Sequence, residues 1–452
     1  MSPDDRTEDP YTPGHGSMAY LVRRYELDLD IRLSSNRLDG RARILATAAE
    51  ELDAVVLSLA GLKASKVRIN GAKPAKVVQR GETLVVRPGA PIPAGSDLEL
   101  DIRYEGSPGP SHGVWGDIGW EELEDGVLVA GQPTGAPTWF PCNDHPQQKA
   151  SFRITATTDS GYRVISNGLL VGQHRKSSRE TWVYEQHEPM APYLATLIIG
   201  RYRELELGRS GNEGASLVTV RAAVPPTLHE EALSGLADQV RMVELFTELF
   251  GPYPFPEYTV VVTEDELEIP LEAQTLSIMG RNHITTDWDD QRLLAHELAH
   301  QWFGNSVTSA AWQDIWLHEG FACYAEWLWS EHAGRGTAQE RAAAAWRRLG
   351  SEPQDLEIGR PGPELMFDDR VYKRGALTLH AVRVAVGDPL FFRSLRTFGS
   401  EHRHANASTE DFLRVLDHVC AGVRGFTARE VLERWLYQQA LPGLPDADVI
   451  QT

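Results

Sequence analysis

The chain has 452 residues, of which 42% are hydrophobic and 24% charged, a composition typical of a globular protein with two or three domains. Its formal net charge of -20 argues against nucleic acids and anionic membranes as partners. No apolar run reaches the roughly eighteen residues that a membrane-spanning helix needs. An acidic surface favours cationic ligands, such as peptides with a free amino terminus, although solubility explains the charge equally well.

Cysteine content and the N-terminus indicate the cellular setting. Cys142, Cys323 and Cys420 are far apart and odd in number, which fits neither a disulfide framework nor a cysteine-based zinc site. A reducing cytoplasm is therefore expected. The first residues are acidic and rich in Pro and Gly, without the basic start and apolar stretch of a signal peptide. Residues 1–17 are predicted to form a disordered tail.

The first half of the chain has the two-residue period of β-strands. From about Tyr20 to Leu207, short segments such as YELDLDIRL (25–33) and LELDIRYEG (98–106) alternate apolar and polar residues. Turn-rich stretches such as SSNRLDG and PGAPIPAGS separate these segments. This spacing of short strands predicts an all-β domain over residues 18–205.

The pattern changes after the polar residues 208–216. Residues 228–250 have apolar side chains at helical spacing, and this stretch ends at Gly251-Pro252. A strand-like segment at 258–265 follows, and helices are expected near 286–303, 319–332, 336–349 and 372–385. Residues 206–452 are therefore predicted to form a second, mainly helical domain.

The sequence LLAHELAHQWFGN (293–305) has the spacing of a metal site. His296 and His300 are four residues apart on a predicted helix, about 40° apart around its axis, so both imidazoles leave one face. This is the geometry that a tetrahedral zinc requires of two nitrogen ligands. Glu297 is rotated by about 100° from His296 and lies beside the metal, where it can act on a metal-bound water. On this motif alone, two surface histidines remain an alternative.

A third ligand distinguishes these alternatives. Glu319 lies on the next predicted helix, in LHEGFACY (317–324), nineteen residues beyond His300. Two histidines and one glutamate leave the fourth zinc position open for water, as in catalytic zinc sites. Glu326 follows on the same helical face and can accept a hydrogen bond from a ligand histidine, unless it is simply solvated.

These residues resemble the aminopeptidase N family of zinc metallopeptidases, which includes leukotriene A hydrolase. HELAHQWFGN followed by LHEGFACY is similar to the family's His-Glu-x-x-His, eighteen residues, Glu signature. Residues 139–152, 265–280 and 370–377 are similar to further family segments in the same order. The resemblance implies an N-terminal β-saddle domain and a thermolysin-like catalytic domain, without the large C-terminal helical domain that long members carry.

The resemblance also implies roles that the residues alone do not reveal. Tyr372 corresponds to the family tyrosine whose hydroxyl stabilises the oxyanion; otherwise it is one of thirteen tyrosines. Glu272 corresponds to the glutamate that binds the α-amine of the substrate. Gln132 corresponds to a glutamine of the β domain that contacts the same amine, and Glu319 is implied as a further amine contact.

The sequence departs from the family pattern in two segments. Where the family has Gly-x-Met-Glu-Asn, residues 269–273 read IPLEA, and Pro270 removes one backbone donor. This departure leaves the preferred N-terminal residue open. His318 precedes the ligand Glu319 where asparagine is common, either as an extra zinc ligand or with a supporting or surface role.

Together, the motif and the resemblance imply a zinc-dependent aminopeptidase with one zinc per chain. Glu297 would act as the general base, and Tyr372 would donate a hydrogen bond to the oxyanion. The expected partners are peptides with a free N-terminus, and the chain is expected to be a monomer. An endopeptidase or an epoxide hydrolase with the same zinc centre is the nearest alternative. A binding protein with a structural zinc is a more distant one.

Overall fold

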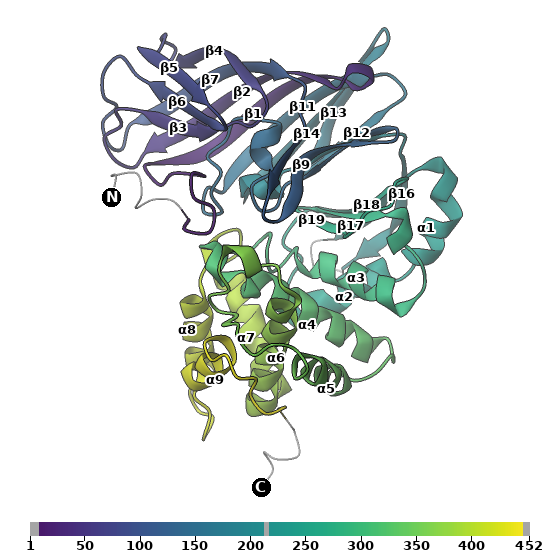
Figure 1. Ribbon diagram of the computed structural model, residues 1–452. Helices are drawn as coiled ribbons and strands as arrows, with labels where there is room; N and C mark the ends of the chain where they lie inside the picture. The colour runs from purple at the N-terminus through teal and green to yellow at the C-terminus, as the bar shows by residue number, and fades with distance from the viewer. Residues whose placement is uncertain (1–8, 212–216, 446–452) are drawn as a thin grey trace.

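The protein forms two lobes in the computed structural model, which describes residues 9–211 and 217–445. Figure 1 shows the strands of the first half of the chain packed in one lobe and the helices of the second half in the other. A β-rich N-terminal domain followed by a mainly helical domain is the fold class that the sequence predicts. In the described part of the chain, we find no helix of the length and apolarity that crossing a bilayer requires.

The largest sheet of the β domain has seven strands. Alternate residues of its central strand β1, including Tyr25, Leu27 and Leu29, are buried, while the residues between them face outward. This alternation places one face of the sheet on the hydrophobic core. In spatial order the strands are β13 (Leu169–Lys176), β14 (Arg179–Met190), β11 (Ala150–Asp159), β1 (Tyr20–Arg32), β2 (Arg37–Ala48), β7 (Asp97–Gly106) and β4 (Lys63–Ile69).

Two smaller sheets complete the β domain. Between them and the large sheet lies an aromatic core in which Tyr25 contacts Phe140 and Phe152. The Tyr104 hydroxyl donates to the Trp139 carbonyl at 3.0 Å, which fixes the segment leading into β11. The smaller sheets are β12 (Arg163–Ser166), β15 (Leu197–Gly200), β10 (Gly126–Ala130), β9 (Gly116–Leu123) and β8 (Pro110–Gly113), and β3 (Val55–Ser58), β6 (Thr83–Arg87) and β5 (Lys76–Arg80).

The second domain begins with a five-stranded sheet that has the short strand β19 at its edge. The expected domain boundary after residue 205 falls inside the first strand of this sheet, β16 (Arg203–Ser210). Pairing of β16 with β17 assigns it to the second domain. The order is β16 (Arg203–Ser210), β17 (Val218–Val224), β18 (Glu257–Thr263), β20 (Leu276–Gly280) and β19 (Leu271–Ala273).

Helices cover this sheet and form the lower lobe (Figure 1). Two of them, α4 and α6, cross at glycines: a Cβ added to Gly320 would lie 2.8 Å from the Gly375 Cα. Only two residues without side chains permit this approach. The helices are α1 (His229–Gly235), α2 (Gln239–Phe250), α3 (Trp288–Ala299), α4 (Trp316–His332), α5 (Ala338–Leu349), α6 (Asp369–Val386), α7 (Asp388–Glu401), α8 (Thr409–Val419) and α9 (Ala428–Leu436).

The N-terminal segment 9–17 connects the two lobes, and the prediction of a disordered tail is wrong for these residues. Asp9 is 2% exposed and accepts a hydrogen bond from the Trp312 N–H at 2.7 Å. The Tyr11 hydroxyl accepts one from the Gly362 N–H at 2.9 Å. These specific contacts supply the ordering that the Pro- and Gly-rich composition lacks. Residues 1–8 lie outside the described residues.

Candidate zinc centre

Three buried side chains meet where α3 approaches the start of α4. His296 lies in the last turn of α3, His300 follows its final residue, and Glu319 lies in the first turn of α4. The Glu319 Oε2 atom is 3.4 Å from His296 Nε2 and 3.5 Å from His300 Nε2. In a tetrahedral zinc site with bonds of about 2.0–2.1 Å, ligand atoms lie roughly 3.3–3.4 Å apart. The three residues present therefore fit a zinc ion.

The opposite ring nitrogen of each histidine faces an acceptor. His296 Nδ1 lies 2.8 Å from Glu326 Oε1, and His300 Nδ1 lies 3.1 Å from the Phe303 carbonyl oxygen. These acceptors favour a proton on Nδ1 and leave the Nε2 lone pairs directed at the space beside Glu319. The arrangement orients both rings as metal ligands.

Glu326 lies among positive charges. Its Oε2 atom is 3.2 Å from Arg292 Nη1 and 3.9 Å from Lys373 Nζ. Burial alone would raise the pKa of Glu326, but Lys373, the His296 ring and Arg292 outweigh it and lower that pKa to about 2. Glu326 is therefore ionised, and its charge supports the His296 ring from behind.

Replacing Glu326 by Gln is expected to weaken zinc binding by roughly 10–100-fold, the range for a partner that hydrogen-bonds a metal ligand. The amide keeps an acceptor for His296 but leaves Arg292 and Lys373 without their buried counter-charge. Competition with a chromophoric chelator measures the affinity. Glu331→Gln is the matched control, since Glu331 lies on the same helix and pairs with Arg383. Equal affinities of the Glu326 and Glu331 variants would contradict the role of Glu326.

Two further carboxylates lie beside the three possible ligands. Atoms of Glu272, Glu297 and His300 come within 4.8 Å of one another. The Glu297 Oε2 atom is buried and has no hydrogen-bond partner among the described residues. Burial raises the pKa of both carboxyl groups. A carboxylate oxygen free of other partners is suited to accept a proton from a water at the zinc site.

Tyr372 lies on α6 and faces His296. The two rings stack with centroids 6.0 Å apart and an interplanar angle of 17°. The close crossing of α4 and α6 at Gly320 and Gly375 brings Tyr372 this near. Burial and the nearby carboxylates raise the pKa of Tyr372 well above its usual value. The hydroxyl therefore stays protonated and can donate a hydrogen bond.

Glu272 lies on the edge strand β19. The amide groups of Gln301 and Asn305 donate to the carbonyl of the next residue, Ala273, each at 3.0 Å, and so fix the strand to the end of α3. Pro270 precedes β19, so the missing N–H lies outside the strand. The departure from the family pattern at Pro270 therefore leaves the strand pairing of Glu272 intact.

Gln132 belongs to the β domain, and its Nε2 atom is buried without a hydrogen-bond partner among the described residues. A Cβ on the preceding Gly131 would lie 2.1 Å from the Tyr193 carbonyl oxygen. Burial, Glu272 and Glu319 raise the pKa of the Tyr193 hydroxyl, so this tyrosine lies near the acidic side of the site. The Nε2 donor of Gln132 cannot bind an ammonium, so only its Oε1 oxygen is suited to the α-amine contact that the resemblance implies.

His318 is neither on the surface nor available as an extra ligand through Nε2. It is 1% exposed, and its Nε2 atom accepts a hydrogen bond from the Ser309 N–H at 2.7 Å. Burial lowers the pKa of His318 to about 3, so the ring is neutral. Of the alternatives that the sequence left open, a supporting role remains: His318 holds the chain before α4 in place.

Arg292 and Lys373 are site residues that reading the sequence missed. Arg292 lies four residues before His296 on α3, a spacing that places both side chains toward the same neighbour, Glu326. The i, i+4 spacing could have identified Arg292. Lys373 reaches Glu326 from α6, and only the packing of α6 on α4 shows this contact.

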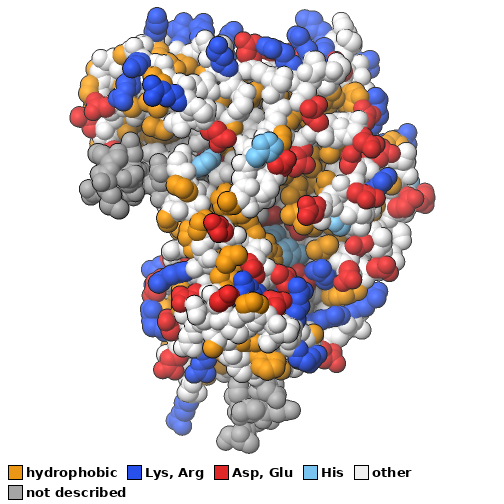
Figure 2. All heavy atoms as spheres, in the orientation of Figure 1, with side chains coloured by type: hydrophobic (Ala, Val, Ile, Leu, Met, Phe, Trp, Pro, Cys, Tyr) orange, Lys and Arg blue, Asp and Glu red, His pale blue; other side chains and the backbone are white. Residues whose placement is uncertain are grey.

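A hollow lies between the two lobes (Figure 2). In Figure 2, histidine side chains are visible at the bottom of this hollow, and Asp and Glu side chains gather to its right. The carboxylates of Glu272, Glu297 and Glu319 within the site favour a positively charged group on the ligand. The site residues therefore suit an ammonium group approaching the zinc.

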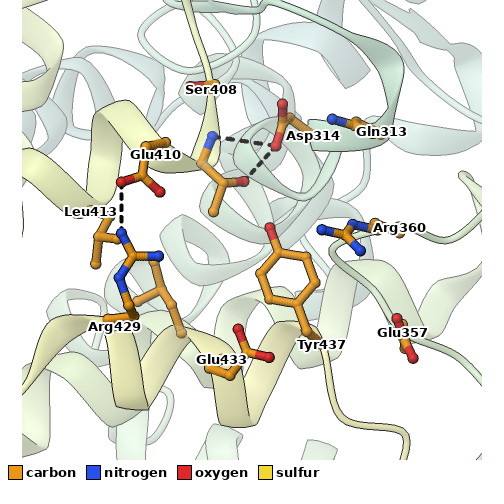
Figure 3. Close-up of a pocket in the computed structure, with 12 residues that line it drawn as sticks. Gln313, Asp314, Glu357, Arg360, Ser408, Glu410, Leu413, Arg429, Glu433 and Tyr437 are labelled. Atoms are coloured by element: carbon orange, nitrogen blue, oxygen red, sulfur yellow. Dashed lines mark hydrogen bonds and ion pairs between the residues drawn. The ribbon is translucent and has the colours of Figure 1, made fainter.

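A cavity of about 370 Å³ lies elsewhere in the second domain, between Trp312–Asp314 and the helices α8 and α9 (Figure 3). Its charged residues largely engage their neighbours: Asp314 accepts hydrogen bonds from Thr409, and Arg429 pairs with Glu410 at 2.7 Å. No residue of the zinc centre lines it. The hydrogen bonds between Asp314 and Thr409 connect the start of α8 to the segment before α4.

Comparisons with known proteins agree with this geometry. Residues 22–194 match the peptidase M1 N-terminal domain, and residues 235–435 match the peptidase family M1 domain. The leucyl aminopeptidase of Saccharolobus solfataricus is 27% identical over 447 residues, which cover 94% of this chain and 54% of the relative. Aminopeptidase M1-D of Oryza sativa subsp. japonica is 26% identical, over 93% of this chain and 50% of the relative. The chain thus spans about half the length of these curated relatives.

Solved structures match over nearly their whole length. An M1 zinc metallopeptidase of Deinococcus radiodurans is 30% identical, with 97% of this chain and 99% of that chain covered and a TM-score of 0.88. A mutant of a zinc metallopeptidase from the same organism, bound to a Tyr-Ser-Ala substrate, is 29% identical with the same coverage and a TM-score of 0.89. The cofactor is therefore zinc. Both domain matches and the shared fold show that the chain belongs to peptidase family M1.

Proposed function

We propose that the protein is a zinc-dependent aminopeptidase that removes the N-terminal residue from peptides. The observation that carries the proposal is the group of His296, His300 and Glu319 at ligand spacing beside the unpartnered Glu297 oxygen. Curated relatives that span the chain are named aminopeptidases, and a similar solved enzyme holds a tripeptide. These likenesses support the substrate class.

The proposed mechanism begins with zinc held by His296, His300 and Glu319. Zinc bound there would supply Lewis acidity, which would polarise the scissile carbonyl and make a water easier to deprotonate. Glu297 takes the proton of the attacking water and passes it to the leaving amine. Tyr372 donates a hydrogen bond to the oxygen on which negative charge develops.

Substrate anchoring would determine that cleavage occurs one residue from the end. The α-ammonium pairs with Glu272, and the Gln132 side chain and Glu319 supply further oxygen contacts. The edge position of β19 leaves one side of this strand open for backbone pairing with an extended peptide. Recognition of the free amine and of the backbone together explains an exopeptidase rather than an endopeptidase.

The function is tested with fluorogenic aminoacyl substrates and with N-acetylated versions of the same compounds, each with and without a chelator. Turnover of the free-amine substrates that the chelator abolishes and zinc restores is the expected result. Turnover of acetylated substrates at a similar rate would indicate an endopeptidase. Stoichiometric zinc without turnover of any substrate would indicate a structural zinc.

Tyr372→Phe is expected to lower kcat while KM changes little, because the hydroxyl acts on the transition state and not on the bound substrate. Loss of one oxyanion donor typically reduces kcat by roughly 10²–10³-fold. Steady-state kinetics on one aminoacyl substrate measures both constants. Tyr324→Phe is the control, since its hydroxyl contacts His380 in the helical core. A parental kcat in the Tyr372 variant would contradict the assignment.

We also propose that the protein works in a reducing compartment, the cytoplasm. The support is that Cys142, Cys323 and Cys420 are all buried and unpaired. Buried thiols without disulfides are typical of proteins kept under reducing conditions.

A further inference from the structure

Lys149 of the β domain extends its ammonium group into the second domain. The residue directly precedes β11, and its Nζ atom donates to the carbonyls of Ser306 at 2.8 Å and Asn305 at 3.0 Å. The Thr308 hydroxyl lies at 2.9 Å and the Ala405 carbonyl at 3.3 Å. These acceptors engage all three N–H groups of an ammonium. Each acceptor is a neutral oxygen.

Placing a cation in this position is unfavourable in itself. Burial lowers the pKa of the Lys149 ammonium to about 7. Because desolvation of a charge offsets much of what its hydrogen bonds contribute, such a lysine is a weak stabiliser of the fold. Its significance therefore lies in the turn that it holds, residues 304–308.

This turn closes the end of the zinc helix. The N–H of Asn305 donates to the His300 carbonyl at 2.9 Å, and the N–H of Ser306 donates to the Gln301 carbonyl at 3.1 Å. These bonds satisfy carbonyls that a helix terminus leaves free. Gly304 has φ +128°, and a Cβ there would lie 3.0 Å from His300 Nδ1. The turn therefore runs directly beside a ligand imidazole.

The same turn also fixes the strand that carries Glu272. The Asn305 side chain donates to the Ala273 carbonyl at 3.0 Å, and Ala273 follows Glu272 in β19. From the β domain, the Tyr193 hydroxyl donates to the Gly304 carbonyl at 3.2 Å. Residues 304–308 thus connect a zinc ligand, the amine-binding strand and the β domain.

We propose that Lys149 is a positioning residue of the active site. By holding the Asn305 and Ser306 carbonyls from the other domain, it sets the turn that orients the His300 imidazole and the Glu272 strand. The effect on His300 concerns zinc binding alone. The effect on Glu272 rests on the proposed aminopeptidase function.

Lys149→Met tests the proposal, because methionine keeps much of the side-chain volume but donates no hydrogen bond. We expect zinc affinity, measured by chelator competition, to fall about tenfold, as for other partners that support metal ligands. At saturating zinc, KM for aminoacyl substrates should rise more than kcat falls. Thr308→Val removes one of the four acceptors and also the hydroxyl's own hydrogen bond to the Gly304 carbonyl at 2.8 Å, so it should lower zinc affinity in the same direction.

Gln147→Ala is the matched control. Gln147 lies two residues before Lys149 and also crosses between the domains, donating to the Ala310 carbonyl at 2.7 Å, but its acceptor lies beyond the turn. The control should keep parental zinc affinity and KM. Equal losses in the Gln147 and Lys149 variants would show that domain docking alone matters and would overturn the proposal.

Parental zinc affinity in both Lys149→Met and Thr308→Val would also overturn it. If Lys149→Met does not fold, Thr308→Val decides, and unchanged zinc affinity in that variant is the contradicting result. Because the affinity measurement uses no peptide, it tests Lys149 even if the parent protein does not cleave aminoacyl substrates. Failure of the proposed function and failure of this proposal are therefore distinguishable.

Discussion

The Glu297→Gln variant is expected to bind one zinc per chain and to lose nearly all turnover. Glu297 Oε2 has no partner among the described residues, and Glu297 lies outside the group of His296, His300 and Glu319 at ligand spacing. Glutamine has nearly the same shape but cannot accept a proton at neutral pH. General-base catalysis typically contributes roughly 10²–10⁴-fold, and kcat should fall by at least the lower figure.

Metal analysis and kinetics on the same preparation separate this role from metal binding. His300→Ala and Glu319→Ala should lose zinc together with activity, whereas Glu297→Gln should lose activity alone. The Glu297 variant should also be at least as thermally stable as the parent, because it removes one of the clustered buried carboxylates. Lost zinc, or a kcat within about tenfold of the parent, would contradict the assignment.

Glu272→Ala is expected to lower kcat/KM for aminoacyl substrates. The loss should correspond to about 2–5 kcal/mol of transition-state stabilisation, the range for breaking a buried charge pair. An α-ammonium held near zinc needs a compensating carboxylate, and its loss leaves a desolvated charge without a partner. N-acetylated peptides carry no ammonium, so they should be poor substrates of the parent. Their kcat/KM should fall far less in the Glu272 variant than that of the free-amine substrates.

A two-by-two comparison tests this role: parent and variant, each with the free and the acetylated form of one peptide. Glu268→Ala is the control, because Glu268 lies four residues earlier and is exposed. The Glu268 variant should change kcat/KM by no more than a small factor for either substrate. Equal losses of the Glu272 variant on both substrates would mean that Glu272 supports the fold. Efficient cleavage of the acetylated peptide by the parent would remove the aminopeptidase assignment.

The group of possible metal ligands that the structure brings together could be predicted from sequence because its signal is local. His296 and His300 follow helical spacing, and Glu319 lies on the next helix, so few alternatives fit a zinc site. Helix limits were less accurate: a helix was expected over 286–303, but α3 ends at Ala299 and His300 follows it. Hydrogen bonds from the following turn end the helix there, and periodicity does not encode them.

Contacts between distant segments could not be predicted. Lys149 and Lys373 lie in the family-like segments 139–152 and 370–377, but the sequence indicates no role for them. Their partners lie on other elements and, for Lys149, in another domain. For His318 the sequence leaves a ligand, a supporting and a surface role open, and only its hydrogen bond to Ser309 distinguishes the supporting one. A polar residue acquires its role from the three-dimensional neighbours that satisfy it, and a single sequence does not specify these neighbours.

The N-terminal segment also constrains the order of folding. Asp9 meets a partner 303 residues later in the chain, and Tyr11 meets one 351 residues later. At typical synthesis rates of about 5–20 residues per second, the ribosome adds the second partner roughly 20–70 s after Tyr11. During that interval the β domain can collapse and bind Ser17 through Asn143, but the Tyr11 contact cannot form. Full attachment of the segment to the second domain is therefore a late event, and a chain released before residue 362 would lack the Tyr11 contact.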